Sequence, residues 1–167
     1  MELDISCCFT GHRPDKLPWG ENEEDPRCLA AKEWLERAIL SAYEKGYRHF
    51  LCGVARGADT YFAEAVLALR KRFPDVTLEC ARPCESQADY WPQKDRSRYE
   101  GILNQCDYET MVQHSYTRGC MMRRNRYMVD HASHIIAMYD GIPEGGTAQT
   151  LAYALRHRLT TDIFNIE

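Results

Sequence analysis

Residues 49–59, HFLCGVARGAD, join a short apolar run to a glycine-containing turn and the start of an amphipathic segment. The run 49–52 predicts a buried strand, and the apolar residues of 58–72 recur at helical spacing. Two glycines stand four positions apart between these elements, where backbone N–H groups can point at an anion at the helix N-terminus. The stretch therefore predicts the strand–turn–helix unit of an α/β fold.

The same alternation of apolar runs and amphipathic segments continues on both sides of this unit. Further strands are predicted at 5–10, 76–81, 108–112, 134–139 and 162–166, and further helices at 27–45, around Trp91 to Leu103, at 120–131 and at 145–158. Such alternation predicts βαβ units and a parallel sheet, with right-handed crossovers that place helices on both faces. We expect one domain over residues 1–167, with a Rossmann-like three-layer fold and a mostly parallel sheet.

Charge and hydropathy narrow the class of partner. The chain has a formal net charge of −4, whereas strong nucleic-acid binding needs a basic surface. No stretch approaches the roughly 20 apolar residues of a membrane span, and the first residues carry acids but no basic segment of the kind that opens a signal peptide. We therefore expect a cytoplasmic protein with no membrane partner and no strong nucleic-acid binding.

The eight cysteines do not form a recognisable metal or disulfide pattern. Cys7, Cys8, Cys52 and Cys80 lie in apolar runs, where a free cysteine behaves as a small hydrophobic residue. There is no C-x-x-C pair, and the one ligand set that can be imagined, Cys80 and Cys84 with His114, lacks the spacing of a structural zinc site. We expect unpaired thiols, no metal and no cofactor.

The first unusual strand end is Thr10-Gly11-His12-Arg13-Pro14. Glycine lets a ligand approach the backbone closely, and a threonine hydroxyl and an arginine guanidinium both donate hydrogen bonds to phosphate. His12 either titrates near neutral pH or caps the loop. The alternative interpretation is a plain turn whose polar residues are solvated.

The second unusual strand end is the turn from Gly53 through Ala55, Arg56 and Gly57 to Asp59. It matches neither the G-x-G-x-x-G fingerprint nor a Walker loop, although its amides can face an anion at the helix start. Asp59 is either a residue that caps the helix N-terminus or the acceptor of a hydrogen bond from a ribose or a base.

The third feature lies on the predicted helix 120–131. Arg123 and Asn125 are candidate ligand contacts, because arginines near the other loops would supply a positive field for phosphate. Three arginines among four positions otherwise indicate a solvated face, and Asp130 then pairs with Arg126 at helical spacing.

The fourth feature follows the strand 134–139. Tyr139 and Asp140 end the strand, and Gly145-Gly146-Thr147 opens a helix as a second anion site. The alternative is a glycine-rich turn in which Thr147 is the N-cap. No catalytic triad or zincin motif can be assembled, and Asp59 and Glu144 are the weak candidates for a catalytic acid.

These motifs together resemble the SLOG superfamily, which is similar to the DNA-processing DprA proteins and the LOG-type phosphoribohydrolases, and within it the YpsA-like branch. The resemblance rests on the following residues: Thr10 to Pro14, the Gly-x-x-x-Gly-x-Asp turn, Pro83, Gln87, Trp91, Tyr99, Glu100, Leu103, Gln105, Asp107 to Glu109, Asn125, Asp130, Tyr139 and Asp140. It implies a Rossmann-like fold and a nucleotide-derived ligand, and it makes a homodimer plausible by analogy.

The resemblance leaves catalysis open. LOG enzymes use a Pro-Gly-Gly-x-Gly-Thr-x-x-Glu loop with a catalytic glutamate, whereas residues 143–150 here read PEGGTAQT, with one glycine fewer and Thr150 in place of the glutamate. Three functions stand: binding or sensing of a nucleotide-derived, phosphate-bearing ligand; hydrolysis of an N-glycosidic or phosphate bond of a nucleotide; and protein interaction through exposed Trp91 and Tyr99.

Overall fold

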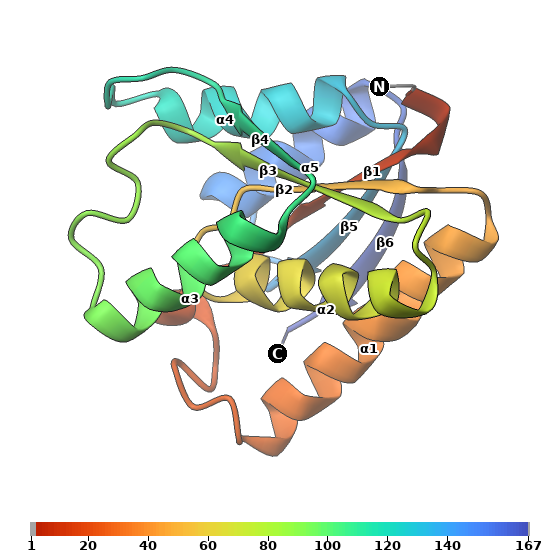
Figure 1. Ribbon diagram of the computed structural model, residues 1–167, viewed down its shortest axis with the longest axis horizontal. Helices are drawn as coiled ribbons and strands as arrows, with labels where there is room; N and C mark the ends of the chain where they lie inside the picture. Colours follow the sequence, from red (N-terminus) through yellow and green to blue (C-terminus); the bar gives the residue numbers. More distant parts are fainter. Residues whose placement is uncertain (1–2, 167) are drawn as a thin grey trace.

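Six strands form one parallel sheet in the computed structural model, which describes residues 3–166 (Figure 1). The strand order is β4-β3-β2-β1-β5-β6, and every neighbouring pair is parallel. The strands are β1 (Ser6–Thr10), β2 (His49–Cys52), β3 (Thr77–Arg82), β4 (Tyr108–Met111), β5 (His134–Tyr139) and β6 (Thr160–Asn165). The expected parallel sheet is confirmed, and no antiparallel strand joins it among the described residues.

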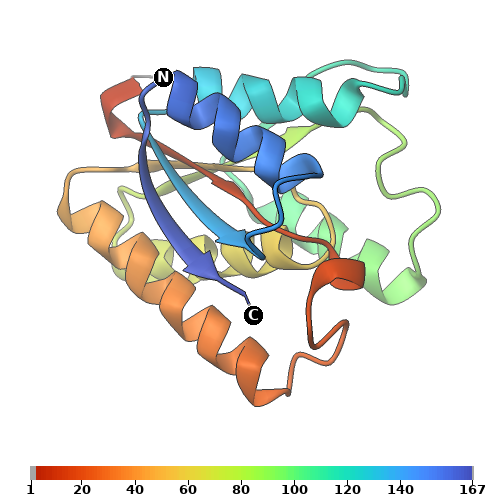
Figure 2. The ribbon, with the colours of Figure 1, turned by 180° about the vertical axis from the view of Figure 1, so that it is seen from behind.

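Five α-helices cover the sheet on both faces (Figures 1 and 2). α1 (Pro26–Glu44), α2 (Ala58–Arg72) and α3 (Gln93–Gln105) lie on one face, and α4 (Cys120–Asp130) and α5 (Gly146–Arg156) lie on the other. Each face has its own apolar cluster: Phe9 and Phe50 point into the first, and Cys8 and Leu51 into the second. The three-layer Rossmann-like fold predicted from the sequence is therefore confirmed.

The ends of the elements follow local signals. Asp25 caps α1 by accepting a hydrogen bond from the Arg27 N–H at 2.8 Å, and Gly46 follows the helix with a φ of +108° that favours glycine. β6 begins at Thr160 instead of the expected position 162, because it pairs with β5 from His134↔Thr160 onward. No helix of the described chain is long and apolar enough to span a membrane.

Two buried histidines join neighbouring strands through paired polar contacts. His49 contacts Thr77 through Nδ1 at 2.7 Å and Glu79 through Nε2 at 2.7 Å. His134 of β5 repeats this arrangement on the other side of β1, with Nδ1 at 2.6 Å from Thr160 and Nε2 at 3.1 Å from Asp162 of β6. Each imidazole thus has both ring nitrogens satisfied inside the sheet, as burial of a polar group requires.

The order in which strands are added to the sheet reverses between β1 and β5, and this switch point positions the site. β1, β2, β3 and β4 are laid down successively toward one edge, after which α4 returns the chain to the other side of β1. The segments that follow β1 and β5 therefore lead to helices on opposite faces of the sheet. In open α/β sheets, a crevice forms at such a point, beyond the carboxyl ends of the strands.

Candidate functional site

A pocket of about 320 Å³ lies at this reversal, and we call it the switch-point pocket. Its walls come from the end of β1, the start of α2, the middle of α4 and the N-terminus of α5. The volume is within the range of small-molecule sites, which are roughly 300–1,000 Å³. Four segments that are distant in sequence thus converge where the fold predicts a ligand.

The switch-point pocket contains a subset of the residues selected from the sequence. The predicted residues that line it are Thr10, Gly11, His12, Arg13, Ala55, Asp59, Asn125, Gly146 and Thr147. The predicted residues that do not line it are Gly53, Arg56, Gly57, Arg123, Tyr139, Asp140 and Gly145. The lining residues that the sequence analysis missed are Phe9, Asp15, Lys16, Met121, Arg124 and Met128.

The N-terminus of α5 forms one wall of the pocket. Gly145 is the N-cap, with a φ of +94° and no side-chain cap, so the interpretation of Thr147 as the N-cap is wrong. Gly146 has open space where a Cβ would stand, and Thr147 is buried. The first N–H groups of a helix have no partner within the helix and carry a partial positive charge. This wall is therefore suited to an anion.

Two exposed cations, Arg13 and Lys16, lie beside this wall. A Cβ on Gly145 would lie 2.6 Å from Lys16 Nζ, which puts the ammonium group directly over the positive end of α5. Arg13 and Lys16 line the pocket, and within residues 3–166 neither side chain has a hydrogen-bond or ion-pair partner. Positive charge beside a helix N-terminus is unfavourable unless an anion balances it, and among the described residues only the more distant carboxylates of Asp140, near Lys16, and Asp59, near Arg13, oppose it.

Arg124 is the cation at the floor of the pocket, and only 3% of it is exposed. Its guanidinium donates hydrogen bonds to the carbonyl oxygens of Gly53 at 2.6 Å and Ala81 at 3.1 Å, and to Asn125 Oδ1 at 2.8 Å. A Cβ on Gly53 would lie 2.4 Å from the guanidinium carbon, so this glycine makes room for the arginine. Burial lowers the pKa of Arg124, although an arginine stays charged in proteins.

The sequence did contain a signal for Arg124. The buried residues Cys120, Arg124 and Met128 of α4 are four positions apart, so they share the inward face of the helix. The interpretation of the three arginines as a solvated face holds for Arg123 and Arg126, which are exposed, and is wrong for Arg124.

Asp59 lies in the first turn of α2 and is 7% exposed. Its Oδ2 accepts a hydrogen bond from the Ala55 N–H at 3.1 Å, which closes the loop between β2 and α2. Burial raises the pKa of this carboxyl, and the nearby Arg124 charge opposes that rise only in part. Gly57, not Asp59, is the N-cap of α2, so Asp59 stabilises the loop from inside the helix.

His12 connects the loops that follow β1 and β5. It is 4% exposed, and its Nε2 accepts a hydrogen bond from the Asp140 N–H at 3.1 Å. When Nε2 accepts this bond, the imidazole is neutral with its proton on Nδ1, whereas a protonated His12 would instead pair through Nε2 with Asp140 Oδ1, which lies 3.3 Å away. Burial lowers the pKa of His12 from its ordinary value, in agreement with this tautomer. His12 therefore positions the Asp140 loop and adds no positive charge to the pocket.

The free energy of unfolding is expected to fall as the pH is lowered below 6.5. Burial lowers the pKa of both His12 and His134 from the ordinary value of 6.5, so the unfolded chain takes up protons at a higher pH than the native protein. The stability contributed by the neutral imidazoles is complete above 6.5 and is lost as the pH falls through the lowered native values. Urea unfolding between roughly pH 8 and pH 5 measures this slope.

The double variant His12→Gln/His134→Gln should show a flatter pH dependence of unfolding over that range. His157→Gln, which replaces an exposed histidine, is the matched control and should retain the wild-type slope. A double variant with the wild-type slope would contradict the assignment of the two buried imidazoles as neutral groups.

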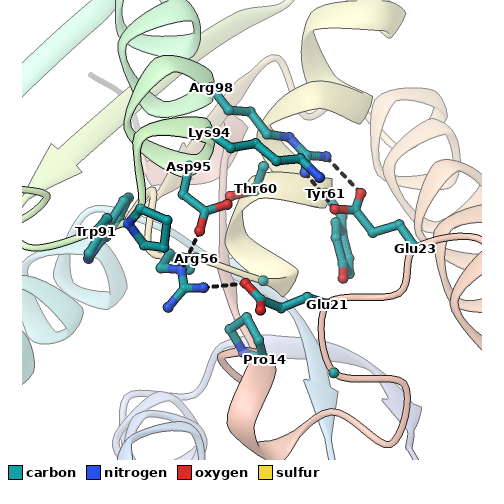
Figure 3. Close-up of a pocket in the computed structure, with 13 residues that line it drawn as sticks. Pro14, Glu21, Glu23, Arg56, Thr60, Tyr61, Trp91, Lys94, Asp95 and Arg98 are labelled. Carbon is teal, nitrogen blue, oxygen red and sulfur yellow. Dashed lines mark hydrogen bonds and ion pairs between the residues drawn. The ribbon is translucent and has the colours of Figure 1, made fainter.

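Arg56 lies outside the switch-point pocket and is engaged elsewhere (Figure 3). Its guanidinium pairs with Glu21 of the loop before α1 and with Asp95 of α3, the latter at 2.9 Å. Arg56 lines a separate pocket of about 280 Å³, which we call the Arg98 pocket. Arg98 also lines it and is paired with Glu23 and Glu64. Both arginines are neutralised by acids, which makes them unfavourable phosphate contacts.

The remaining predicted residues have other partners. Arg123 donates to Gln113 Oε1 at 3.0 Å on the exposed side of α4, and Tyr139 donates to the Ile142 carbonyl at 2.6 Å. Asp130 accepts a hydrogen bond from Tyr153 at 2.7 Å, and no ion pair with Arg126 forms among the described residues.

Glu144, a candidate catalytic acid, and Tyr99, a candidate partner contact, both lie where they do not fit those roles. Glu144 is exposed and does not line the pocket. Tyr99 is 6% exposed, so it cannot be the exposed partner contact that the protein-interaction hypothesis requires. Within residues 3–166, no group of three or more His, Cys, Asp or Glu side chains is placed to hold a metal ion.

Comparison with known sequences identifies relatives over nearly the whole chain. A family model described as the YspA SLOG family matches residues 7–166. The UPF0398 protein YpsA of Bacillus subtilis (strain 168) is 24% identical over 153 residues, which are 90% of this chain and 84% of that protein. The SPbeta prophage-derived protein YoqJ of the same bacterium is 29% identical over 157 residues, which are 86% of this chain and 91% of that protein.

Two solved structures are similar in fold. DNA processing protein A from Helicobacter pylori, whose description concerns single-stranded DNA binding, has a TM-score of 0.62 at 15% identity and matches 96% of this chain, which spans 65% of that protein. The structure of TM1055 has a TM-score of 0.56 at 13% identity and matches 96% of this chain and 72% of that protein. At such identities the likeness concerns the fold alone.

Proposed function

Because this chain belongs to the YspA SLOG family, whose model covers residues 7–166, we propose that it binds a phosphate-bearing, nucleotide-type ligand in the switch-point pocket. The observation that carries the proposal is the pair of unpartnered cations, Arg13 and Lys16, beside the open N-terminus of α5. Phosphate is the anion that this combination of a helix N-terminus, a lysine and an arginine binds well.

The remaining walls suit the sugar and base of a nucleotide. Thr10 offers a hydroxyl, Asn125 an amide and Asp59 a carboxyl, and Phe9 and Met128 add apolar surface beside them. Polar groups that fix the orientation of a ligand, next to apolar side chains that contact its rings, are features of small-molecule sites.

Thermal unfolding with a panel of nucleoside monophosphates, nucleoside diphosphates and sugar phosphates tests the proposal. A ligand at a hundredfold excess over its Kd stabilises the native state by about 2.7 kcal/mol, which raises the Tm of a domain of this size by about 5 to 10 °C. The double variant Arg13→Ala/Lys16→Ala should bind the active ligand at least about 10-fold more weakly, because two charged phosphate contacts are lost.

The matched control is Arg123→Ala/Arg126→Ala, which removes the same charge from the exposed side of α4. It should retain wild-type affinity. Equal losses in the two double variants would show that only the overall charge matters, and the absence of any Tm shift across the panel would refute the proposed function.

Hydrolysis of a nucleotide is a second candidate, favoured by one observation. Asp59 lines the pocket, and burial raises the pKa of its carboxyl, as a general acid requires. Release of free base from a bound nucleoside monophosphate, abolished in Asp59→Asn and retained in Glu144→Gln, would establish the reaction. Asparagine can still accept the Ala55 N–H, so loss of activity in that variant would report on the proton and not on the loop.

Nucleic-acid binding is a weaker candidate for this chain. The fold neighbour from Helicobacter pylori is described as binding single-stranded DNA, but its sequence identity of 15% transfers no function. The net charge of −4 and the pairing of Arg56 and Arg98 with acids disfavour the binding of a phosphate backbone.

A further inference from the structure

The switch-point pocket continues into a second cavity of about 330 Å³, which we call the Trp91 pocket. Arg13, Asp15 and Met121 line both cavities, so the two are contiguous and Arg13 stands at their junction. A molecule bound in the first cavity can therefore extend past Arg13 into the second.

Trp91 forms a preorganised aromatic wall of this second cavity. Its ring meets Tyr99 edge to face, with centroids 5.1 Å apart and an interplanar angle of 78°. Tyr99 is fixed in turn, because its hydroxyl donates to Gln87 Oε1 at 2.9 Å and accepts from Arg82 Nε at 2.7 Å. Gln87 Nε2 donates to the Gly53 carbonyl at 2.9 Å, which ties this wall to the floor beside Arg124.

The residues that line the Trp91 pocket suit a flat ring with a polar edge. Trp91 is half-buried, and within the described residues its indole N–H has no hydrogen-bond partner. Met121 and Pro14 add apolar surface, and Asp15 adds an exposed carboxylate acceptor. Aromatic side chains bind nucleobases by stacking, and unpaired donors and acceptors at the rim can meet the polar edge of a base.

Charge decides against a second phosphate in the Trp91 pocket. Its other cation, Arg56, is already paired with Glu21 and Asp95, as Figure 3 shows beside Trp91. Arg13 is unpaired and lies between the cavities, which is where a phosphate linkage joining two ring-bearing halves would pass.

We propose that the ligand of this protein is dinucleotide-like, with two ring-bearing halves joined through phosphate at Arg13, and that its second ring stacks on Trp91. The inference rests on the proposed function, since it assigns the switch-point pocket to the first half and to the phosphates. It adds a binding residue and a ligand class that the first pocket alone does not define.

The test compares mononucleotides with matched dinucleotides. The probes are AMP with diadenosine diphosphate and GMP with diguanosine diphosphate, titrated calorimetrically against the purified full chain. For one base we expect the dinucleotide to bind about 10-fold or more tightly than its mononucleotide, and Trp91→Ala to remove that gain while leaving mononucleotide affinity unchanged. Trp91→Phe keeps a stacking surface and should restore part of the gain.

Tryptophan fluorescence supplies a second readout. The dinucleotide should quench wild-type emission, and the quenching should be lost in Trp91→Phe but retained in Trp34→Phe, since Trp34 packs against Phe164 away from the site. Equal affinities for mono- and dinucleotides, with no effect of Trp91 substitution, would overturn this inference and leave the proposed function standing. Loss of all nucleotide binding would instead overturn the proposed function.

Discussion

Arg124→Ala is expected to lower the free energy of unfolding by about 3 to 5 kcal/mol, the range for removing one member of a buried charged network. The substitution leaves the carbonyl oxygens of Gly53 and Ala81 buried without their donor, and it removes the larger of the two positive charges, Arg124 and Arg13, that act on buried Asp59. Urea unfolding followed by circular dichroism measures the change, and nucleotide affinity should fall with it because the floor of the pocket is lost.

Arg123→Ala is the matched control, because it removes the neighbouring arginine from the exposed side of the same helix. Its effect should stay within about 0.5 kcal/mol, as is usual for surface substitutions. The free energy of unfolding of Arg124→Lys should lie between those of Arg123→Ala and Arg124→Ala, since lysine retains the charge without the planar set of donors. Equal stabilities of the Arg123 and Arg124 alanine variants would contradict the role assigned to the buried guanidinium.

Gly57→Ala is the second substitution with a large expected effect, a loss of about 2 to 4 kcal/mol. Gly57 has φ +86° and ψ −128°, a backbone conformation that is essentially restricted to glycine. A Cβ there would lie 2.8 Å from the His12 carbonyl oxygen, which accepts the Ala58 N–H at 3.1 Å. The substitution therefore pushes the loop after β1 away from the start of α2, and both loops border the site.

Gly20→Ala separates the two causes of this loss, the strained backbone conformation and the close contact of the new Cβ with the His12 carbonyl oxygen. Gly20 also has a positive φ of +59°, but no atom lies within 4 Å of the position of its Cβ. Only the backbone cost applies there, about 1 to 2 kcal/mol. In denaturant unfolding, Gly57→Ala should have a clearly lower free energy of unfolding than Gly20→Ala. Similar free energies would mean that movement of the loop relieves the contact with the His12 carbonyl.

The fold was predictable because its signals are local and repeated. The apolar runs 49–52 and 134–139 and the helical spacing of 58–72 mark strands and helices without tertiary information, and parallel strands then place their following loops at one edge. This reasoning brought Thr10, Asp59 and Gly146 together in one pocket.

The rest of the site depends on distances that a sequence does not specify. Lys16 lies in a short 3₁₀ turn, Pro14–Lys16, inside what reads as a polar loop, and only the fold brings it over Gly145. Arg56 lies within a glycine-containing turn that suggests anion binding, but Glu21 and Asp95 approach from two other segments and neutralise it. Local chemistry identifies the donors, whereas the charges that surround them depend on tertiary contacts.

The position of Lys16 over the start of α5 has a consequence for the free protein. Two like charges held together without an ion-paired anion are a local conflict in an otherwise consistent structure, which the Asp140 carboxylate near Lys16 offsets only in part, and such conflicts are commonly concentrated at functional sites. Any small dianion that reaches this point relieves the conflict, whether or not it belongs to a physiological ligand. Sulfate stabilises folded proteins in general, so the resting protein is expected to gain more stability from sulfate over chloride, at equal ionic strength, than the double variant Arg13→Ala/Lys16→Ala gains. Inorganic phosphate in the cell would then compete with the true ligand for this point.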